Sequence, residues 1–372
     1  MTTNPTVPAA SADEDELHAL AALADGELQA RLLAGVSRTF ALTIPQLPDS
    51  LCYAVSNAYL LCRIVDTIED EPALSTAHKR MFCSQFAQTV AGDYSPEALA
   101  SELAPLLSEQ TLADERLLVR LLPRVIGITH SLTAPQRRAI ERCVAVMAEG
   151  MAEFQAGAGP EGLQDLPELD QYCYYVAGVV GEMLTELFCE YSPAIARHRE
   201  TLLRLSVSFG QGLQMTNILK DHWEDRERGV CWLPRDAFPQ ADFDLERLSP
   251  GQHQEVFGDG LADLIGIAHG HLKNALAYSL TIPAEEAGIR NFCLWAAGMA
   301  VLTLRRINER RDFTTGREVK ISRRSVRFTV AALRLTATRN TLVRLLFYLA
   351  GMGLPARSNG RRLRALNMPP GT

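Results

Sequence analysis

Apolar residues recur every three or four positions along most of the chain, which is the spacing of helices that bury one face. The strongest of these patterns cover residues 25–36, 78–90, 112–128, 134–154, 169–191, 202–226, 262–280 and 291–308. No segment alternates apolar and polar residues as a half-buried strand does, and no stretch repeats another. The pattern predicts an all-α protein with roughly a dozen helices packed as a single large domain.

Proline and glycine mark the breaks between these patterns. Pro45 and Pro48 precede a helix that ends before Pro72, and residues 91–110 are predicted to be a looser connection. The clearest linker is the run of small residues at 156–160. Helices of the same character continue beyond it, so we interpret it as a loop inside one domain.

Composition indicates a large core in a reducing compartment. Of the 372 residues, 47% are hydrophobic, and the eight cysteines are scattered without a C-x-x-C pair. We interpret the cysteines as free thiols of a cytoplasmic protein. Residues 1–16 lack the basic and apolar regions of a signal peptide and are predicted to be disordered, as is a basic tail at 356–372. The net charge of −7 argues against a nucleic-acid partner.

Positive charge collects towards the C-terminus. Residues 305–364 hold sixteen Lys and Arg against three acids, and four arginines interrupt the apolar positions of residues 326–354. No apolar run there approaches the roughly 20 residues that span a bilayer. A basic amphipathic helix on the inner, anionic face of a membrane and ordinary packing against the core both fit the pattern.

One predicted helix carries oxygen ligands along a stripe. Asn217, Asp221 and Asp225 are four residues apart, so they rise along one face at about 6 Å per step. Carboxylate and amide oxygens are ligands for Mg²⁺, which takes its remaining ligands from water and substrate phosphates. A solvated acidic face with Lys220 and Arg226 as neighbours fits this stripe slightly better when it is considered alone.

A second stripe has the same design. Tyr59, Arg63, Asp66 and Asp70 are spaced four, three and four, and Glu69 flanks their face. The remaining positions are apolar, so the helix is predicted to be buried nearly all round, where charged residues are rare unless paired or metal-bound. An ion pair between Arg63 and one of these acids would not explain why three acids lie within five residues. Two such stripes facing each other would hold Mg²⁺ ions that bind an allylic diphosphate and draw it off as a leaving group.

Four ordered motifs carry a resemblance to a known family. They are Ser37-Arg38-Thr39-Phe40, the acidic stretch 59–70, Tyr172-Cys173-Tyr174-Tyr175-Val176-Ala177-Gly178 and the stretch 214–225. In this order and at these separations the chain resembles the squalene/phytoene synthase family over residues 36–328. The resemblance implies one all-α prenyl transferase domain over residues 17–355. Its helices would surround a central apolar cavity, with both acidic stripes at the mouth.

The resemblance also implies an activity. Two molecules of farnesyl diphosphate would join head to head to give presqualene diphosphate in a Mg²⁺-dependent step, and NADPH would then reduce this product to squalene. Dehydrosqualene, presqualene diphosphate and phytoene synthesis, which need no hydride, are the nearest alternatives. A catalytically silent interaction subunit and a basic membrane-binding module are alternatives of other classes.

Individual roles follow from the same resemblance. The implied Mg²⁺ ligands are Asp66, Glu69, Asp70, Asn217, Asp221 and Asp225. The implied substrate contacts are Ser37, Arg38, Thr39, Phe40, Tyr59, Arg63, Gln214, Lys220, Arg226 and Tyr278. The implied catalytic residues are Tyr172 and the aspartates Asp66, Asp70, Asp221 and Asp225. A phenol at Tyr172 would transfer a proton, or its ring would steady a carbocation.

The glycines beside Tyr172 allow two interpretations. Gly178 and Gly181 leave backbone bare, which fits close packing of two helices as well as room for a bulky ligand or a bend. The resemblance favours a tunnel for a prenyl chain.

The implied nicotinamide site has no Rossmann fingerprint, because no G-x-G-x-x-G follows a strand. Lys320, Arg323 and Arg324 are instead expected to meet the extra phosphate of NADPH, although a solvated basic face explains them equally well. The chain departs from the family in two places. Residues 293–298 replace a Pro-Gln pair of animal members, and Lys220 stands where Arg is common, so it meets phosphate as a point charge rather than a fork.

Overall fold

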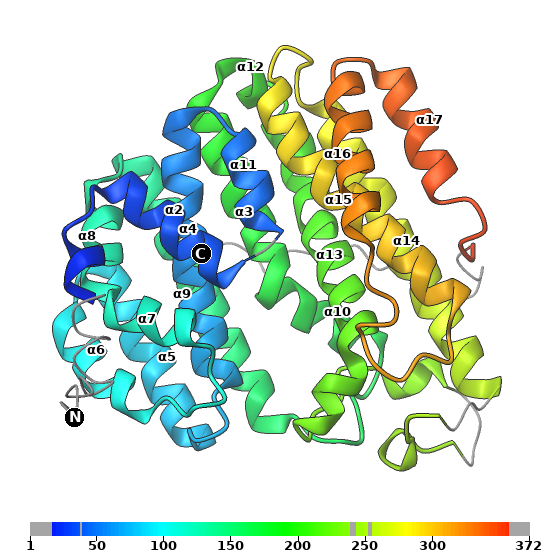
Figure 1. Ribbon diagram of the computed structural model, residues 1–372, viewed down its shortest axis with the longest axis horizontal. Helices are drawn as coiled ribbons and strands as arrows, with labels where there is room; N and C mark the ends of the chain where they lie inside the picture. The colour runs from blue at the N-terminus through cyan, green and yellow to red at the C-terminus, as the bar shows by residue number, and fades with distance from the viewer. Residues whose placement is uncertain (1–16, 38, 239–242, 252–254, 357–372) are drawn as a thin grey trace, which may run out of the picture. The chain divides into compact units, whose positions relative to one another are not determined.

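The computed structural model describes residues 17–37, 39–238, 243–251 and 255–356 (Figure 1). Within these residues there is no β-strand, and a single isolated bridge pairs Leu163 with Pro234. The all-α prediction is therefore confirmed. The segment 1–16, most of the tail 356–372 and the predicted substrate contact Arg38 lie outside the described residues.

Contacts between residues divide the chain into two compact units. The first unit comprises Met1–Ala156 and Met183–Ala196, and the second comprises Gly157–Glu182 and Arg197–Thr372. The border at Ala156 coincides with the small-residue run that the sequence marks as the clearest linker. The prediction of one domain over residues 17–355, with a cavity between the two acidic stripes, stays a prediction.

In the first unit, helices pack around α4. In chain order they are α2 (Asp25–Val36), α3 (Phe40–Thr43), the 3-10 turn η1 (Ile44–Gln46), α4 (Asp49–Asp70), α5 (Thr76–Ala91), α6 (Pro96–Leu103), η2 (Ala104–Leu106), α7 (Ala113–Arg120), α8 (Leu122–Ser131), α9 (Ala134–Gly157) and α12 (Pro193–Ala196). Leu51, Leu60, Leu61, Ile64 and Ile68 of α4 are fully buried. Burying side chains of this size contributes about 1.5–3 kcal/mol each.

Two predictions about helix boundaries in this unit are wrong. Residues 91–110 are not a structureless connection, because α6 begins there with Ser95 accepting from the backbone N–H of Ala98 and with Pro96 in its first turn. Both are standard signals for a helix start. The predicted helix over 112–128 is two helices, broken at Leu121 just before Pro123.

The second unit is built on three long helices. It contains α10 (Leu166–Cys173), the π-helical turn η3 (Tyr174–Gly178), α13 (Arg199–Glu227), the 3-10 turns η4 (Arg235–Ala237) and η5 (Leu245–Arg247), α14 (Glu255–Thr281), α15 (Ala287–Glu309), α16 (Arg323–Thr336) and α17 (Asn340–Ala350). Helix α11 (Val179–Tyr191) begins in this unit and ends in the first. Helix α13 packs against α14, α15 and η3.

Glycines allow very close approach between η3, the start of α11 and α13. A methyl group on Gly181 would collide with the carbonyl oxygen of Ser206, and one on Gly210 would collide with that of Ala177. Of the two interpretations of the glycines near Tyr172, close helix packing is therefore the one that the structure supports, together with the local widening of the π-turn. Space for a prenyl chain is not needed to explain them.

Two helices, α4 and α15, are long and apolar enough to cross a membrane by length and composition alone. Their most apolar windows are 72% and 78% buried inside the protein, as in core helices of proteins that cross no membrane. The basic segment 326–354 is not one helix but the pair α16 and α17, with a turn between them.

Candidate active site

Helix α4 holds three acids within five residues, and the surroundings of two of them, Asp66 and Glu69, disfavour the ionised form. The pKa of Asp66 is raised to about 7, mainly by burial and further by Asp70 and Glu115, against an opposing effect of Arg63. The pKa of Glu69 is also raised, by burial and by the nearby charge of Asp70. Since carboxylates crowded in this way favour a cation between them, the donor set fits a divalent metal ion.

Arg63 is the main positive charge within this acidic stripe. Its Nε donates to Glu115 Oε1 over 3.0 Å, and a second guanidinium nitrogen contacts the same oxygen. Arg63 Nη1 lies 3.6 Å from Asp66 Oδ2. The predicted pairing with Asp66 is thus present, but the closer partner is Glu115 of α7, which was not among the predicted site residues. No spacing rule connects residues 63 and 115, so only the fold reveals this pair.

Glu69 is fixed by neighbours on two other helices. Gln155 of α9 donates to its carboxylate over 3.0 Å, and Lys79 of α5 donates to its backbone carbonyl. The side chain of Glu69 is 6% exposed, whereas Asp70 at the end of α4 is exposed. One acid is therefore held in place and the other is accessible from solvent.

The residues before α4 form a small polar and aromatic cluster. Ser37 Oγ accepts from the Phe40 N–H over 3.0 Å, and the Phe40 and Tyr59 rings lie 5.0 Å apart. Burial raises the pKa of Tyr59, while its hydrogen bond to Ser37 opposes the shift. Thr39 is exposed beside them. The structure thus brings Ser37, Phe40 and Tyr59 together, with the charge of Arg63 near Tyr59, and their predicted contacts with substrate stay a prediction.

In the second unit, α13 carries the other stripe. Asn217 is exposed, and Asp221 forms an ion pair in which Lys220 Nζ lies 2.9 Å from Asp221 Oδ2. Burial raises the pKa of Asp221, Lys220 lowers it, and Glu224 raises it further. Asp225 is 6% exposed, and Arg228 Nη2 lies 2.5 Å from its Oδ1. This stripe also combines crowded carboxylates with only partial compensation by cations.

Arg226 does not point its donors at open solvent. Its guanidinium donates to the backbone carbonyls of Leu245, Glu246 and Leu248 at 2.5, 3.0 and 2.8 Å. These contacts attach the η5 segment to the end of α13. The predicted contact of Arg226 with diphosphate stays untested, and the observed bonds give this residue a structural role.

A short segment crosses the acidic face of α13. The Gly316 N–H donates to Glu224 Oε1 over 2.8 Å, and Trp223 Nε1 donates to the Phe313 carbonyl over 2.7 Å. We call residues 313–319 the strap. A methyl group on Gly316 would lie 2.8 Å from the Lys220 carbonyl oxygen and 2.9 Å from Asp221 Oδ1. The strap therefore touches the same turn of α13 that holds Asp221, and sequence spacing gave no sign of it.

Tyr172 is buried at the C-terminal end of α10. Its ring is stacked on Trp232 with centroids 4.0 Å apart and planes 9° apart, and only 4% of the residue is exposed. Backbone bonds hold the loop that carries Trp232, because the Leu163 N–H donates to the Leu233 carbonyl and Cys231 donates to that of Gly159. Trp232 is thus fixed in its loop.

The remaining predicted contacts are more dispersed. Tyr278 is 2% exposed and meets Phe209 edge-on at 5.5 Å, and Gln214 is half-buried on α13. Lys320, Arg323 and Arg324 are exposed at the start of α16. No ion pair to these three cations occurs among the described residues. Three exposed cations beside a helix N-terminus fit a phosphate-bearing cofactor by charge alone.

Neither stripe is a complete metal cage. Within the described residues, no group of three or more His, Cys, Asp or Glu side chains is arranged to hold a metal ion. A bound Mg²⁺ would therefore take part of its coordination shell from water or phosphate, which is the usual arrangement for this ion.

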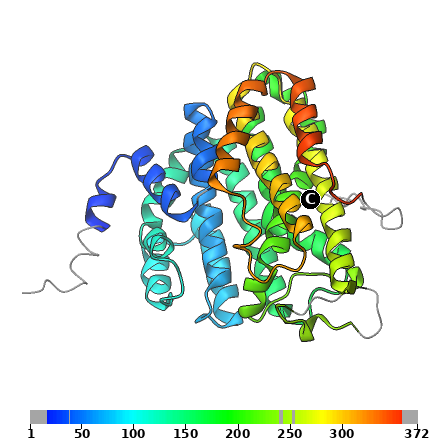
Figure 2. The same ribbon diagram turned by 45° about the vertical axis from the view of Figure 1, so that its right-hand side comes forward.

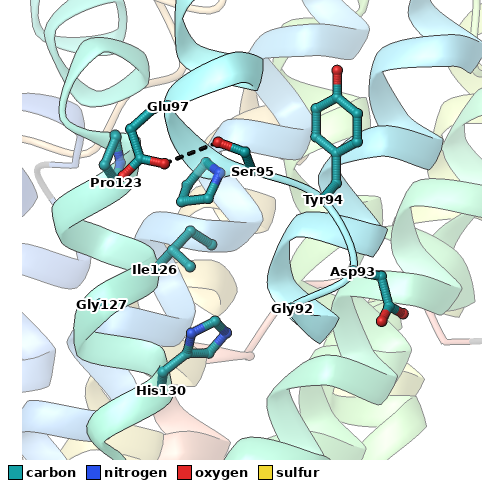
Figure 3. Close-up of a pocket in the computed structure, with 10 residues that line it drawn as sticks. Gly92, Asp93, Tyr94, Ser95, Glu97, Pro123, Ile126, Gly127 and His130 are labelled. Carbon is teal, nitrogen blue, oxygen red and sulfur yellow. Dashed lines mark hydrogen bonds between the residues drawn. The ribbon is translucent and has the colours of Figure 1, made fainter.

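The first unit also has an open hollow of about 500 Å³. It is lined by residues 92–97 and by Pro123, Ile126, Gly127 and His130 of α8 (Figure 3). His130 points into this region, and its Nε2 lies 3.3 Å from the Val90 carbonyl oxygen. None of the predicted site residues lines this hollow.

The helical fold and the carboxylate-rich helices α4 and α13 define the chain as an all-α protein of the isoprenoid synthase type. The family model for squalene/phytoene synthase matches residues 33–325, so the chain belongs to this family.

Curated relatives agree with this assignment, and solved structures share the fold. The chain is 31% identical over 277 residues to squalene synthase ERG9 of Gibberella zeae, which covers 74% of this chain and 57% of that protein. It is 32% identical to a squalene synthase of Dictyostelium discoideum, which covers 82% of this chain and 70% of that protein. The fold is similar to that of TcSQS in complex with BPH1237, with a TM-score of 0.74, 22% identity, and coverage of 91% and 93% of the two chains. A dehydrosqualene synthase gives a TM-score of 0.61 at 19% identity, with coverage of 87% and 98%.

Proposed function

We propose that the chain is a transferase that joins two molecules of farnesyl diphosphate head to head and then reduces the product to squalene. The observation that carries the proposal is the environment of Asp66, whose carboxyl is crowded by Asp70 and Glu115 and only partly compensated by Arg63. Membership of the squalene/phytoene synthase family supports the same activity.

Mg²⁺ is the proposed cation of both stripes. The proposed ligands are Asp66, Glu69 and Asp70 on α4, with Asn217, Asp221 and Asp225 on α13. When bound, Mg²⁺ would neutralise charge that develops on the departing diphosphate. The two stripes lie in different units of the chain.

Binding and orientation of the substrates fall to side chains around the stripes. Arg63 and Lys220 would meet phosphate oxygens, with Ser37 and Tyr59 as hydrogen-bonding partners. Phe40, whose ring is tilted against that of Tyr59, would pack on a prenyl chain. Apolar walls would exclude water, because water would trap the cation as an alcohol.

Tyr172 is the proposed catalytic residue of the first half-reaction. Formation of the cyclopropane of presqualene diphosphate requires loss of a proton, and the Tyr172 phenol would hold or move it. Burial of the ring against Trp232 supports this role, because the flat contact fixes the direction of the hydroxyl.

NADPH is the proposed reductant of the second half-reaction. It would supply a hydride that ends the life of the rearranged cation. Lys320, Arg323 and Arg324 are the residues proposed to hold its extra phosphate, since they are exposed cations at the start of α16. The enzyme is proposed to work in the cytoplasm and to release its hydrocarbon product into the inner face of a membrane.

Incubation of the full chain with labelled farnesyl diphosphate and Mg²⁺, with and without NADPH, tests this function. We expect presqualene diphosphate or another non-reduced product without NADPH and squalene with it, and no product after chelation of Mg²⁺. Asp66→Asn and Asp221→Asn should each lower turnover at least a hundredfold, whereas Asp93→Asn, at the hollow that none of the predicted site residues lines, should not.

Other outcomes contradict parts of the proposal. An unchanged product with NADPH points to dehydrosqualene or presqualene diphosphate synthesis, and a preference for geranylgeranyl diphosphate points to phytoene synthesis. The fold similarity to a dehydrosqualene synthase favours the first of these as the second candidate. If neither substrate is turned over, the remaining interpretation is a catalytically silent member of the family.

A further inference from the structure

Large apolar side chains are unusually exposed on the last two helices of the second unit. Among the described residues, seven of twelve exposed large hydrophobic residues lie between positions 328 and 352. They are Phe328, Leu335, Leu342, Leu345, Tyr348, Leu349 and Met352. Leu335 and Phe328 are 80% and 74% exposed, and Tyr348 is 69% exposed. An apolar patch of this kind on a folded surface marks a site of interaction.

These side chains follow helical stripes. Phe328 and Leu335 are seven residues apart on α16, which is two turns, and Leu342, Leu345 and Leu349 on α17 are spaced three and four. Figure 2 shows α16 and α17 side by side in orange and red, and the two helices are in contact. We call their solvent-exposed sides the outer face.

The opposite sides of both helices are packed into the second unit. Leu333 of α16 and Val343 and Phe347 of α17 are buried, and Leu333 contacts the position of Gly298 on α15. The turn between the helices is held by Arg290, which donates to the Ala337 carbonyl over 2.9 Å and to Asn340 Oδ1 over 2.8 Å. The exposure of the outer face therefore belongs to the folded structure and does not come from a loose end.

The charge of this region is of one sign. Residues 319–372 contain eleven Lys and Arg and no Asp or Glu, although the whole chain carries −7. Arg327, Arg334, Arg339 and Arg344 are exposed between the apolar residues of the outer face. The matching partner is a surface with an apolar interior and a negatively charged boundary to water.

An anionic lipid bilayer has this chemistry. Helices of 14 and 11 residues are too short to span it but long enough to lie in its interface, where their apolar side chains reach the acyl boundary. A second copy of the same face is disfavoured, because like charges would oppose each other. Nucleic acid would match the arginines but not the leucines.

We propose that the outer face of α16 and α17 docks on an anionic bilayer, with Phe328, Leu335 and Leu345 inserted and the arginines at the lipid phosphates. This inference does not depend on the proposed enzymatic activity, since it concerns binding of the protein to vesicles.

Sedimentation of the full chain with vesicles tests the proposal. We expect binding to vesicles that contain phosphatidylglycerol and much weaker binding to vesicles of phosphatidylcholine alone. The variant Arg327→Gln/Arg334→Gln/Arg344→Gln should lower the partition coefficient roughly fivefold for each arginine removed. The variant Leu335→Glu/Leu345→Glu should lower it at least tenfold on both kinds of vesicle.

Matched controls lie on the first unit. Leu112, which is 60% exposed, is replaced by Glu, and the exposed Arg138 is replaced by Gln. Both controls should bind as the unaltered chain does. All variants change exposed side chains, so they should fold, which circular dichroism and thermal melting verify.

Three results would overturn the proposal. The first is equal binding to neutral and anionic vesicles. The second is binding that is changed neither by the triple arginine variant nor by the double leucine variant. The third is a dimer in solution that Leu335→Glu/Leu345→Glu dissociates. The second result would place the binding in the basic residues beyond 356, which both variants retain. The third would make the outer face an interface between copies of the chain.

Discussion

The ring of Trp232 lies flat on the ring of Tyr172, with centroids 4.0 Å apart and planes 9° apart. The two residues come from α10 and from the loop after α13, and both are nearly buried. Because the stack covers one whole face of the phenol, the ring cannot turn without displacing the tryptophan. The role of the Tyr172 ring and the role of its hydroxyl can therefore be tested by separate substitutions.

Replacement of Tyr172 by Phe should remove the proton-transferring hydroxyl and keep the ring stacked on Trp232. We expect turnover of farnesyl diphosphate to fall by about a hundredfold or more, the usual range for loss of a proton-transferring group. The melting temperature should change little, since the ring and its contact with Trp232 remain. Steady-state assays with Mg²⁺ present, together with calorimetry, measure both quantities.

Tyr175→Phe is the control for this prediction, because Tyr175 is a half-buried tyrosine on the adjacent π-turn. It should keep most of the activity. If Tyr172→Phe also keeps most of the activity, the hydroxyl has no part in the rate-limiting chemistry, and only the ring of Tyr172 remains a candidate.

Arg63 and Glu115 should behave as one energetic unit. Glu115 is 6% exposed, so replacement of Arg63 by Gln leaves a buried carboxylate with a weaker partner. We expect each of Arg63→Gln and Glu115→Gln to lower the free energy of unfolding by about 2–3 kcal/mol. The double variant should lose less than the sum of the two, with a coupling of about 1.5–3 kcal/mol in urea unfolding.

The pair of Arg31 with Asp114 is the control for this cycle. Its closest N–O distance is 3.4 Å, and its side chains are 45% and 41% exposed. Exposed pairs contribute about 1 kcal/mol or less, so the Arg31–Asp114 cycle should show little coupling. Equal coupling in both cycles would contradict the importance of burial at Glu115.

Sequence patterns predicted the helices well where one face is apolar over many turns. The predicted limits of α2 match those observed, and α13, α14 and α15 were found with ends displaced by one to seven residues. Helix α6 was missed because it has only eight residues, and its signals, Ser95 followed by Pro96, are local. Long helices average their signal over several turns, whereas a two-turn helix depends on its cap.

Only the site residues that share one face of one helix could be grouped from the sequence. Spacing along α4 and α13 grouped the carboxylates with Arg63 and with Lys220 correctly. Partners that come from other helices, such as Glu115 and Gln155, follow from tertiary packing, which no spacing in the sequence encodes. The division of residues 326–354 into two helices was missed for the same reason. The turn near Ala337 is held by Arg290, which comes from α15.

Acid should destabilise the second unit through His269. Burial lowers the pKa of His269 from 6.5 to about 4, and Lys273 lowers it further. Between these values the unfolded chain binds a proton that the folded chain does not, so the free energy of unfolding falls as pH falls from 6.5 to 4. One such histidine contributes at most about 1.4 kcal/mol per pH unit, and above pH 6.5 it contributes no slope.

His269→Gln should flatten this dependence by the contribution of one proton. Urea unfolding at several values between pH 4 and 7 measures the slope. His222, whose pKa burial also lowers to about 4, remains in the variant, so part of the slope should persist. His198→Gln, at an exposed position, is the control, and an unchanged slope in His269→Gln would contradict the assignment.

Gly316→Ala should disturb the acidic stripe of α13 from outside the helix. The added methyl group would lie 2.8 Å from the Lys220 carbonyl oxygen and 2.9 Å from Asp221 Oδ1, so the strap must move away from backbone that cannot yield. Overpacking of this kind costs about 1–3 kcal/mol, which calorimetry measures. The Gly316–Glu224 hydrogen bond would lengthen at the same time, and we expect Mg²⁺-dependent turnover to fall more than the lost stability explains.

The two effects are separable with matched variants. Gly270→Ala lies inside α14 with no atom near the new methyl group, so it should stabilise the protein by about 0.5–1 kcal/mol and leave turnover unchanged. Glu224→Gln keeps an acceptor for the Gly316 N–H while it removes a charge beside Asp221. If Gly316→Ala raises the Mg²⁺ concentration needed for half-maximal turnover and Gly270→Ala does not, the strap positions the α13 carboxylates. Equal Mg²⁺ requirements in all three variants would limit the strap to a contribution to stability.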